Sequence, residues 1–288
     1  MDLESYLNEH HTSKTVRRYM REIGLFFLSF EKKSIQSKAA SYQDILEYLG
    51  QVRNEKGVQV LKCSLAGIKR YFDYLNATNQ RKDHPAKFIR LRDKIHRDIQ
   101  LQDLFSSSEL LQLLERKERY KLLANRNKMI LGLLVYLGLT TGEIIRLEVE
   151  NIDFDKAKIF IKSTSRTNSR TLKLTPKQVL PMYKYVFEDR PKLLKVESNL
   201  LVISKSGRAE NGEGVSYLVS TFKHLFADRN LNPRTIRQSV ITNLSSSGKD
   251  LRWVQVFAGH RYPSSTEQYR QTEVEALKLA ILKYHPLG

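Results

Sequence analysis

Apolar residues recur at helical spacing through the first quarter of the chain. In residues 12–31 they fall at intervals that place them on one helix face: Val16, Tyr19, Met20, Ile23, Phe26, Phe27 and Phe30. Residues 41–54 and 58–76 repeat this pattern, and Ser41 with Asp44 opens the first of them as a capping box. No strand pattern interrupts these segments, so residues 1–80 are predicted to form a small all-helical domain.

From residue 106 onward the pattern is mixed. The apolar run 129–139, "MILGLLVYLGL", predicts a buried helix and is too short to span a bilayer. Residues 157–163 and 170–175 predict two short strands joined by a polar turn. Helical patterns then resume up to Gly259, a typical helix-ending residue. The fold class expected is mainly α with a small antiparallel β-sheet, and residues 106–288 form the second, α+β domain.

Residues 81–105 separate the two blocks and are polar, charged and interrupted by Pro85. They are predicted to be a basic linker between two domains. The alternative is a further surface helix of a single domain.

Net charge narrows the choice of partner. The chain carries 49 Lys and Arg against 31 Asp and Glu, a formal net charge of +18. Such an excess favours a polyanion, because neutralising phosphates releases condensed counterions. A merely solubilising surface and an anionic membrane are the alternatives, and no lipidation motif or basic amphipathic anchor supports the membrane.

Basic residues also mark where the polyanion would bind. The segment from Lys156 to Phe187, which contains the predicted hairpin, has basic residues and no acidic one. The side chains expected to contact a phosphate backbone are Lys162, Arg170 and Lys173 in the hairpin and Arg90, Arg92 and Lys94 in the linker.

Cysteine usage and the N-terminus bear on the compartment. Cys63 is the single cysteine, so the chain can form neither an internal disulfide nor a cysteine zinc site. Its first residues are acidic and polar, unlike a signal peptide. These features predict a cytoplasmic protein.

Three separated segments resemble the tyrosine recombinases of the phage integrase family, which include the Xer-like enzymes. They are "YLGLTTGEIIRLEVENIDFDKAKIFI" (136–161), "RTIRQSVITNLSSSGKDLRWVQVFAGH" (234–260) and "STEQYRQ" (265–271). The first block is similar to the helical, SAM-like core-binding domain of these enzymes, so the resemblance covers about residues 1–285.

The resemblance implies roles for individual residues. Tyr269 falls at the position of the nucleophile, Arg237 at the second catalytic arginine, and His260, after Gly259, at a phosphate-contacting histidine. Arginines suit this chemistry because the transition state gains negative charge on the phosphate oxygens. A tyrosine phenol, with an ordinary pKa of about 10, becomes a better nucleophile where cations favour the phenolate.

Three positions depart from the family pattern. Thr140 stands where the family has its first catalytic arginine, which removes one cation from the phosphate. Arg234 replaces a histidine, and Arg166 is the residue closest to the lysine general acid of the hairpin. Arginine donates hydrogen bonds well but is a poor proton shuttle, because it stays charged. Our hypothesis is that Arg166 or Arg234 substitutes for the missing cation.

Each of these residues also has a purely structural interpretation. Arg237 could be a helix-surface charge, His260 a helix cap and Tyr269 a packing residue. Their joint spacing in a strongly basic chain favours the catalytic interpretation. Glu143 is interpreted as a structural helix residue, and Trp253 as a core residue.

The resemblance implies site-specific DNA recombination or integration, as in mobile genetic elements, through a 3′-phosphotyrosine intermediate. It implies double-stranded DNA as partner, no cofactor and no metal. It also implies a homotetramer on two DNA sites in which the segment 272–288 docks onto a neighbour; a second recombinase could take part. Two alternatives remain open: a recombinase-fold accessory protein that binds DNA without catalysis, and a topoisomerase-like enzyme that nicks and reseals.

Overall fold

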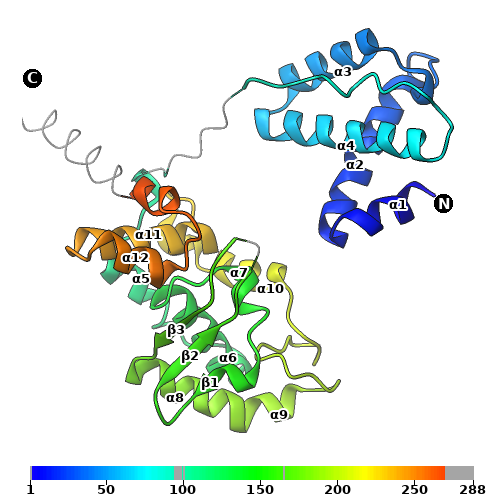
Figure 1. The fold of residues 1–288 in the computed structure, drawn as a ribbon. Coiled ribbons are helices and arrows are strands. Elements are labelled where there is room, and N and C mark those ends of the chain that lie inside the picture. Colours follow the sequence, from blue (N-terminus) through cyan, green and yellow to red (C-terminus); the bar gives the residue numbers. More distant parts are fainter. Residues whose placement is uncertain (1, 94–98, 100, 165, 270–288) are drawn as a thin grey trace, which may run out of the picture. The chain divides into compact units, whose positions relative to one another are not determined.

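The structure is a computed structural model, and it describes residues 2–93, 99, 101–164 and 166–269. Contacts divide the chain into two compact units, Met1–Arg97 and Asp98–Gly288 (Figure 1). The division falls inside the segment 81–105 that the sequence singles out as a linker. Each unit is described by itself.

The first unit is helical throughout its described residues. Its α-helices are α1 (Leu3–His10), α2 (Ser13–Glu31), α3 (Tyr42–Glu55) and α4 (Val58–Ala77), with a 3-10 turn at Ser37–Ala39. The predicted helical faces are the buried ones: Val16, Ile23, Phe26 and Phe30 of α2 lie in one core with Ile45 of α3 and Leu61, Ile68 and Phe72 of α4. The capping box predicted at Ser41 and Asp44 is present, so both the helices and this cap are confirmed.

Most of the expected linker belongs structurally to one unit or the other. Arg81 donates hydrogen bonds to the carbonyl oxygens of Lys38 and Ala40 at 2.7 and 2.9 Å, and Ala86 and Ile89 are buried in the core of the first unit. Phe105 is buried in the core of the second unit. Apolar residues inside the polar segment therefore attach its two ends to different cores.

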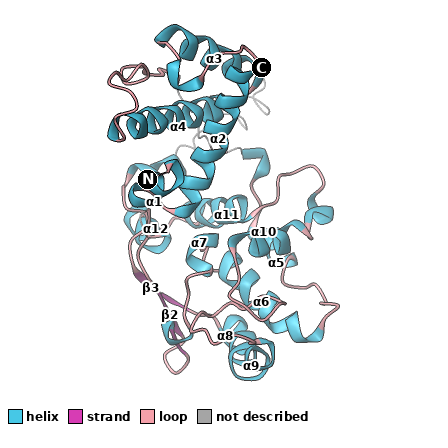
Figure 2. Ribbon diagram, turned by 90° about the vertical axis from the view of Figure 1, so that its right-hand side faces the viewer, coloured by secondary structure: helices cyan, strands magenta, loops and turns pink. Residues whose placement is uncertain are grey.

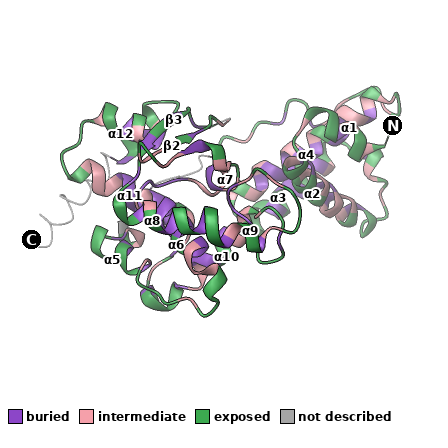
Figure 3. Ribbon diagram, turned by 90° about the horizontal axis from the view of Figure 1, so that it is seen from below, coloured by how far each residue is buried: buried purple, intermediate pink, exposed green. Residues whose placement is uncertain are grey.

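The second unit places helices around one small sheet. Its α-helices are α5 (Ser107–Gln112), α6 (Lys121–Val135), α7 (Thr141–Ile144), α8 (Pro176–Lys184), α9 (Arg190–Leu193), α10 (Gly212–Ser220), α11 (Pro233–Ser246) and α12 (Leu251–Ala258). A π-helical turn at Tyr185–Asp189 joins α8 to α9, and 3-10 turns lie at Leu101–Asp103, Val149–Asn151 and Lys223–Phe226. Helix α6 is buried nearly all round, as its apolar run predicts (Figure 3).

The sheet confirms the predicted hairpin and adds one strand. Strands β1 (Ile152–Asp153), β2 (Lys158–Ile161) and β3 (Arg170–Lys173) pair antiparallel in that order (Figure 1). Strands β2 and β3 are labelled in Figure 2 as well. Ile159 and Leu172 are paired across β2 and β3 and are buried in the core. The predicted fold class, mainly α with a small antiparallel sheet, is confirmed.

Trp253 on α12 was expected in the core, and this expectation is wrong. Its side chain is 46% exposed and stacks on Phe257, with ring centroids 5.3 Å apart. The buried face of α12 is instead formed by Val254 and Ala258, since these positions face α11 and the following chain. Over the described residues, no helix is long and apolar enough to cross a membrane.

Candidate active site

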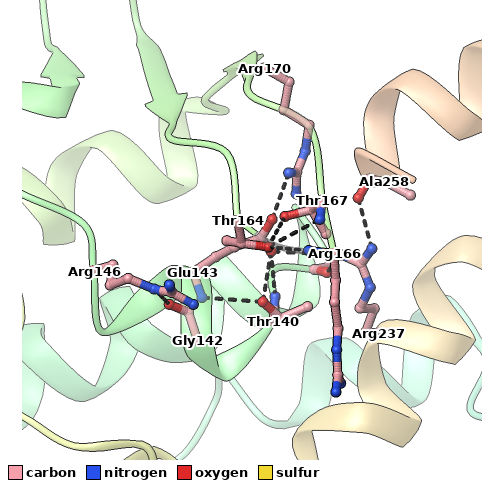
Figure 4. Close-up of polar contacts among 11 residues, drawn as sticks. Thr140, Gly142, Glu143, Arg146, Thr164, Arg166, Thr167, Arg170, Arg237 and Ala258 are labelled. Atoms are coloured by element: carbon pink, nitrogen blue, oxygen red, sulfur yellow. Dashed lines mark hydrogen bonds and ion pairs between the residues drawn. The ribbon is translucent and has the colours of Figure 1, made fainter. Parts of the chain in front are cut away.

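Glu143 is the centre of a buried ionic cluster that joins three elements of the second unit (Figure 4). Its side chain, on α7, is fully buried. Arg170 of β3 donates from Nη1 to Glu143 Oε1 at 2.7 Å, and Arg237 Nη1 of α11 lies 3.9 Å from Oε2. Burial raises the pKa of Glu143, but the hydrogen bond and charge of Arg170, with the charge of Arg237, more than offset this and bring the pKa to about 2. Glu143 is therefore ionised and holds two guanidinium groups in place.

Thr140 acts as the N-cap of α7. Its hydroxyl accepts from the Glu143 backbone N–H at 3.2 Å and its own backbone N–H donates to Glu143 Oε2 at 2.8 Å, a complete capping box. The hydroxyl also donates to Glu143 Oε2 at 2.9 Å. Threonine is among the favoured N-cap residues, so the departure at this position has a local structural role. It supplies no positive charge to a phosphate.

Arg237 is buried and held by backbone oxygens. Its Nη1 donates to the Gly138 carbonyl at 2.6 Å and its Nη2 to the Ala258 carbonyl at 2.7 Å. Burial lowers its pKa and the charge of Glu143 opposes the shift; an arginine remains charged in either case. The interpretation of Arg237 as a helix-surface charge is thereby wrong, because the residue is only 8% exposed.

Arg170 also lies inside the protein, which corrects its expected place on the DNA-facing surface of the hairpin. The residue is 6% exposed, and it fills the space beside Gly259. Gly259 has a φ of +69°, and a Cβ there would lie 2.5 Å from Arg170 Nη1, so both conformation and space require glycine. A side chain alternating inward along β3 cannot reach an external phosphate backbone.

His260 follows Gly259 and is bound to the β2–β3 loop. Thr167 pairs with His260 in an isolated antiparallel bridge, and Asn168 N–H donates to the Gly259 carbonyl at 2.8 Å. The Nδ1 atom of His260 lies 2.8 Å from Thr266 Oγ1. Burial, and then the charges of Arg237 and Arg170, lower the pKa of His260 to about 4, so the ring is neutral at pH 7.

Tyr269 is the last described residue of the helical segment that begins at residue 264, and it lies against His260. The two rings have centroids 5.8 Å apart and planes 16° apart. Tyr269 is 8% exposed and shares an apolar cluster with Ile241, Val254 and Ala258. Burial raises its pKa, while the charges of Arg237 and Arg234 act in the opposite direction. In this arrangement burial outweighs the cations, contrary to the expectation that they favour the phenolate.

The two proposed substitute cations lie at the rim. Arg234 is exposed on the first turn of α11, and its charge reaches Tyr269. Arg166 is exposed in the β2–β3 loop, next to the residue that pairs with His260. In the part of the chain that is described, neither guanidinium has a hydrogen-bond partner.

The other residues predicted to contact DNA differ in exposure and pairing. Lys173, Arg90 and Arg92 are exposed. Lys162 forms ion pairs with Glu148 at 2.8 Å and Glu150 at 3.6 Å, so its charge is already partly compensated. Lys94 and the docking segment 272–288 lie outside the described residues.

Two contributions to this site were missed from the sequence. Glu143 was assigned only a structural role, although it contacts both buried arginines; the pattern Thr140-x-x-Glu143, typical of a capping box, was the available signal. Thr266 was overlooked altogether, and only its place three residues before Tyr269 on a helical turn hinted that it faces the same side.

The chain also matches a known family of proteins. Residues 104–275 match the phage integrase family. The chain belongs to this family, that of the tyrosine recombinases.

Individual relatives cover almost the whole chain. Tyrosine recombinase XerC of Anoxybacillus flavithermus is 23% identical over 286 residues, covering 97% of this chain and 94% of the relative. Tyrosine recombinase XerD of Oceanobacillus iheyensis is 26% identical over 285 residues, covering 96% and 93%.

Solved structures share the fold. The XerH site-specific recombinase bound to its difH substrate in a pre-cleavage complex has a TM-score of 0.70 at 18% identity, over 91% of this chain and 78% of that one. The XerA recombinase has a TM-score of 0.52 at 17% identity, over 99% and 98%.

Proposed function

We propose that this chain is a site-specific DNA recombinase in which Tyr269 cleaves and rejoins double-stranded DNA. The observation that carries the proposal is the convergence of Arg237, His260 and Tyr269 from separate segments: the rings of His260 and Tyr269 stack, and the charge of Arg237 acts on both. The phage integrase match and the two-unit organisation support it.

The chemistry assigns one step to each group. The Tyr269 hydroxyl oxygen attacks the scissile phosphorus, the bond to the 5′ oxygen breaks, and a 3′-phosphotyrosine with a free 5′-hydroxyl results. Arg237 stabilises the charge that grows on the non-bridging oxygens, and His260, neutral at pH 7, donates a hydrogen bond to one of them. Attack by a 5′-hydroxyl on the phosphotyrosine rejoins the strand. The linkage keeps the phosphodiester bond energy, so the cycle needs no nucleotide.

Arg166 and Arg234 are the cations that we assign to the remaining phosphate contact. Both are exposed: the charge of Arg234 acts on Tyr269, and Arg166 adjoins Thr167, which pairs with His260. Neither guanidinium has a hydrogen-bond partner among the described residues. Either could approach an oxygen that the threonine at position 140 leaves without a charge.

The hairpin supports DNA as the partner. Lys158 of β2 lies opposite both Asp153 of β1 and Lys173 of β3, so its charge is offset on one side, whereas Lys173 is an exposed cation on the edge strand β3. A phosphate backbone along this edge would neutralise the charge of Lys173. Action as a tetramer on two DNA sites, with residues 272–288 docked onto a neighbouring copy, is part of the proposal.

A second function rests on a specific observation. Thr140 supplies no cation, and Tyr269 is buried with a raised pKa. Both features suit the second proposed function, in which this chain binds DNA without cleaving it and acts beside an active recombinase.

The deciding experiment traps the covalent intermediate. Wild type and Tyr269→Phe are incubated with nicked duplexes taken from the sequences flanking the gene, and denaturing gels reveal a detergent-resistant adduct. We expect an adduct with wild type and none with Tyr269→Phe, while both shift the duplex equally in a native gel. Equal binding without any adduct would leave the accessory DNA-binding function.

A further inference from the structure

Thr266 is a buried residue with an unusual hydrogen bond. It is 0% exposed, and its Oγ1 lies 2.8 Å from Nδ1 of His260. The buried hydroxyls of Thr235 and Ser239, by contrast, donate to nearby backbone carbonyls. No such carbonyl bond is recorded for Thr266 within the described residues.

This geometry determines which ring nitrogen of His260 carries the proton. If Nδ1 carried it, Nδ1–H would donate to Thr266, and the threonine's own proton would be buried without an acceptor. An unsatisfied buried donor costs about 1–3 kcal/mol. If Thr266 donates to Nδ1 instead, both groups are satisfied and the histidine proton is on Nε2. The Nε2–H tautomer is therefore favoured.

The opposite nitrogen is the one available to a substrate. Nε2 has no hydrogen-bond partner in the described part of the chain and is not among its fully buried unpartnered atoms. An Nε2–H group can donate to a phosphate oxygen, whereas an unprotonated Nε2 would place a lone pair against that oxygen.

We propose that Thr266 is a positioning residue: by donating its hydroxyl proton to Nδ1, it keeps His260 as the Nε2–H tautomer that donates to the scissile phosphate. The inference rests on the proposed function and deepens it. Thr266 precedes Tyr269 by three residues in the helical segment 264–269, so the segment that carries the nucleophile also sets the tautomer of the histidine.

Three variants of the full chain test this. Thr266→Val keeps the shape but removes the hydroxyl, and Thr266→Ser keeps the hydroxyl. Thr242→Val is the matched control, because the Thr242 hydroxyl is buried and makes no hydrogen bond to His260 or to any other described residue. Nitrogen-15 NMR of labelled histidine reports which ring nitrogen is protonated, and the His260→Gln variant identifies the His260 signals among the 7 histidines.

We expect wild type, Thr266→Ser and Thr242→Val to show His260 protonated on Nε2. Thr266→Val should populate the Nδ1–H tautomer and form the Tyr269 adduct about 10-fold more slowly, the scale typical of lost orienting groups, with unchanged DNA affinity.

Two results would overturn the proposal: an unchanged tautomer in Thr266→Val, whatever its rate, or a Thr266→Ser variant as slow as Thr266→Val. If wild type forms no adduct at all, the proposed function fails, and the NMR comparison still decides the role of Thr266.

Discussion

The second unit contains two kinds of cation that differ in how they are held. Arg170 and Arg237 are interior: each is under a tenth exposed, and both lie beside the carboxylate of Glu143. Arg166 and Arg234 are exposed at the rim of the same site. All four are arginines in a basic chain, so composition does not separate them.

Interior and rim arginines differ in how they can stabilise charge on a phosphate. An interior guanidinium is positioned before the substrate arrives, so no reorganisation is needed when charge develops. A rim guanidinium is screened by water and must lose side-chain freedom to make its contact. The interior arginines should therefore dominate folding, and Arg237 the chemistry, while surface cations should dominate encounter with DNA.

Removing the central carboxylate should have the largest effect. Glu143→Gln leaves two buried arginines without a counter-charge, and breaking a buried ion pair costs about 3–5 kcal/mol. Urea unfolding followed by the fluorescence of Trp253, the only tryptophan, reports on this unit. The matched control Glu150→Gln removes an exposed ion pair with Lys162 and should change stability by less than about 1 kcal/mol.

The same variant has a pH signature. The pKa of Glu143 is about 2 in the folded protein against an ordinary value of 4.5. Its stabilisation is therefore complete above pH 4.5 and is lost as the pH falls from 4.5 toward about 2. The stability difference between wild type and Glu143→Gln should shrink across that window; a difference independent of pH would exclude Glu143 as a charged centre.

The arginines come next in magnitude. Arg237→Gln removes an interior donor and should slow formation of the Tyr269 adduct by about 100-fold or more, whereas Arg234→Gln at the rim should slow it about 10-fold. Single-turnover adduct formation on the nicked duplex measures both rates, and native gels check that binding is retained. Equal losses would show that interior placement confers no advantage on this chemistry.

The hairpin lysines should have the smallest effect, and on binding alone. Lys173→Ala removes an exposed charge that has no ion-pair partner among the described residues, so the slope of log affinity against log salt should fall by about one. Because Lys162 is already paired with Glu148, Lys162→Ala should change this slope less. Titrations of duplex DNA at several salt concentrations measure the slope for both variants. Identical changes in slope would mean that the ion pairs of Lys162 open when DNA binds.

Most elements of the fold could be predicted because their signals are local. The helices of the first unit follow from apolar spacing, and Ser41 with Asp44 marks one of their starts. Trp253 was misplaced because the buried face of α12 depends on which neighbours the helix meets.

The site was predictable in part. The resemblance to tyrosine recombinases named Arg237, His260 and Tyr269, and the structure brings these three together. The charge pattern of the hairpin, by contrast, led to the prediction that Arg170 contacts DNA, because a basic residue in a cationic hairpin is expected to be exposed. Only the inward direction of its side chain and the presence of Glu143 beside it show otherwise.

The sequence by itself determined the helical periods, the caps, the hairpin and the order of the candidate catalytic residues, since each depends on neighbours a few positions apart. Tertiary structure alone decided which cations are interior, because burial depends on segments far apart in the chain. It also decided that Gly259 makes room for Arg170, that burial raises the pKa of Tyr269, and that Thr266 meets His260. Desolvation and the tautomer of a histidine are properties of an assembled environment, and no short stretch of residues contains that environment.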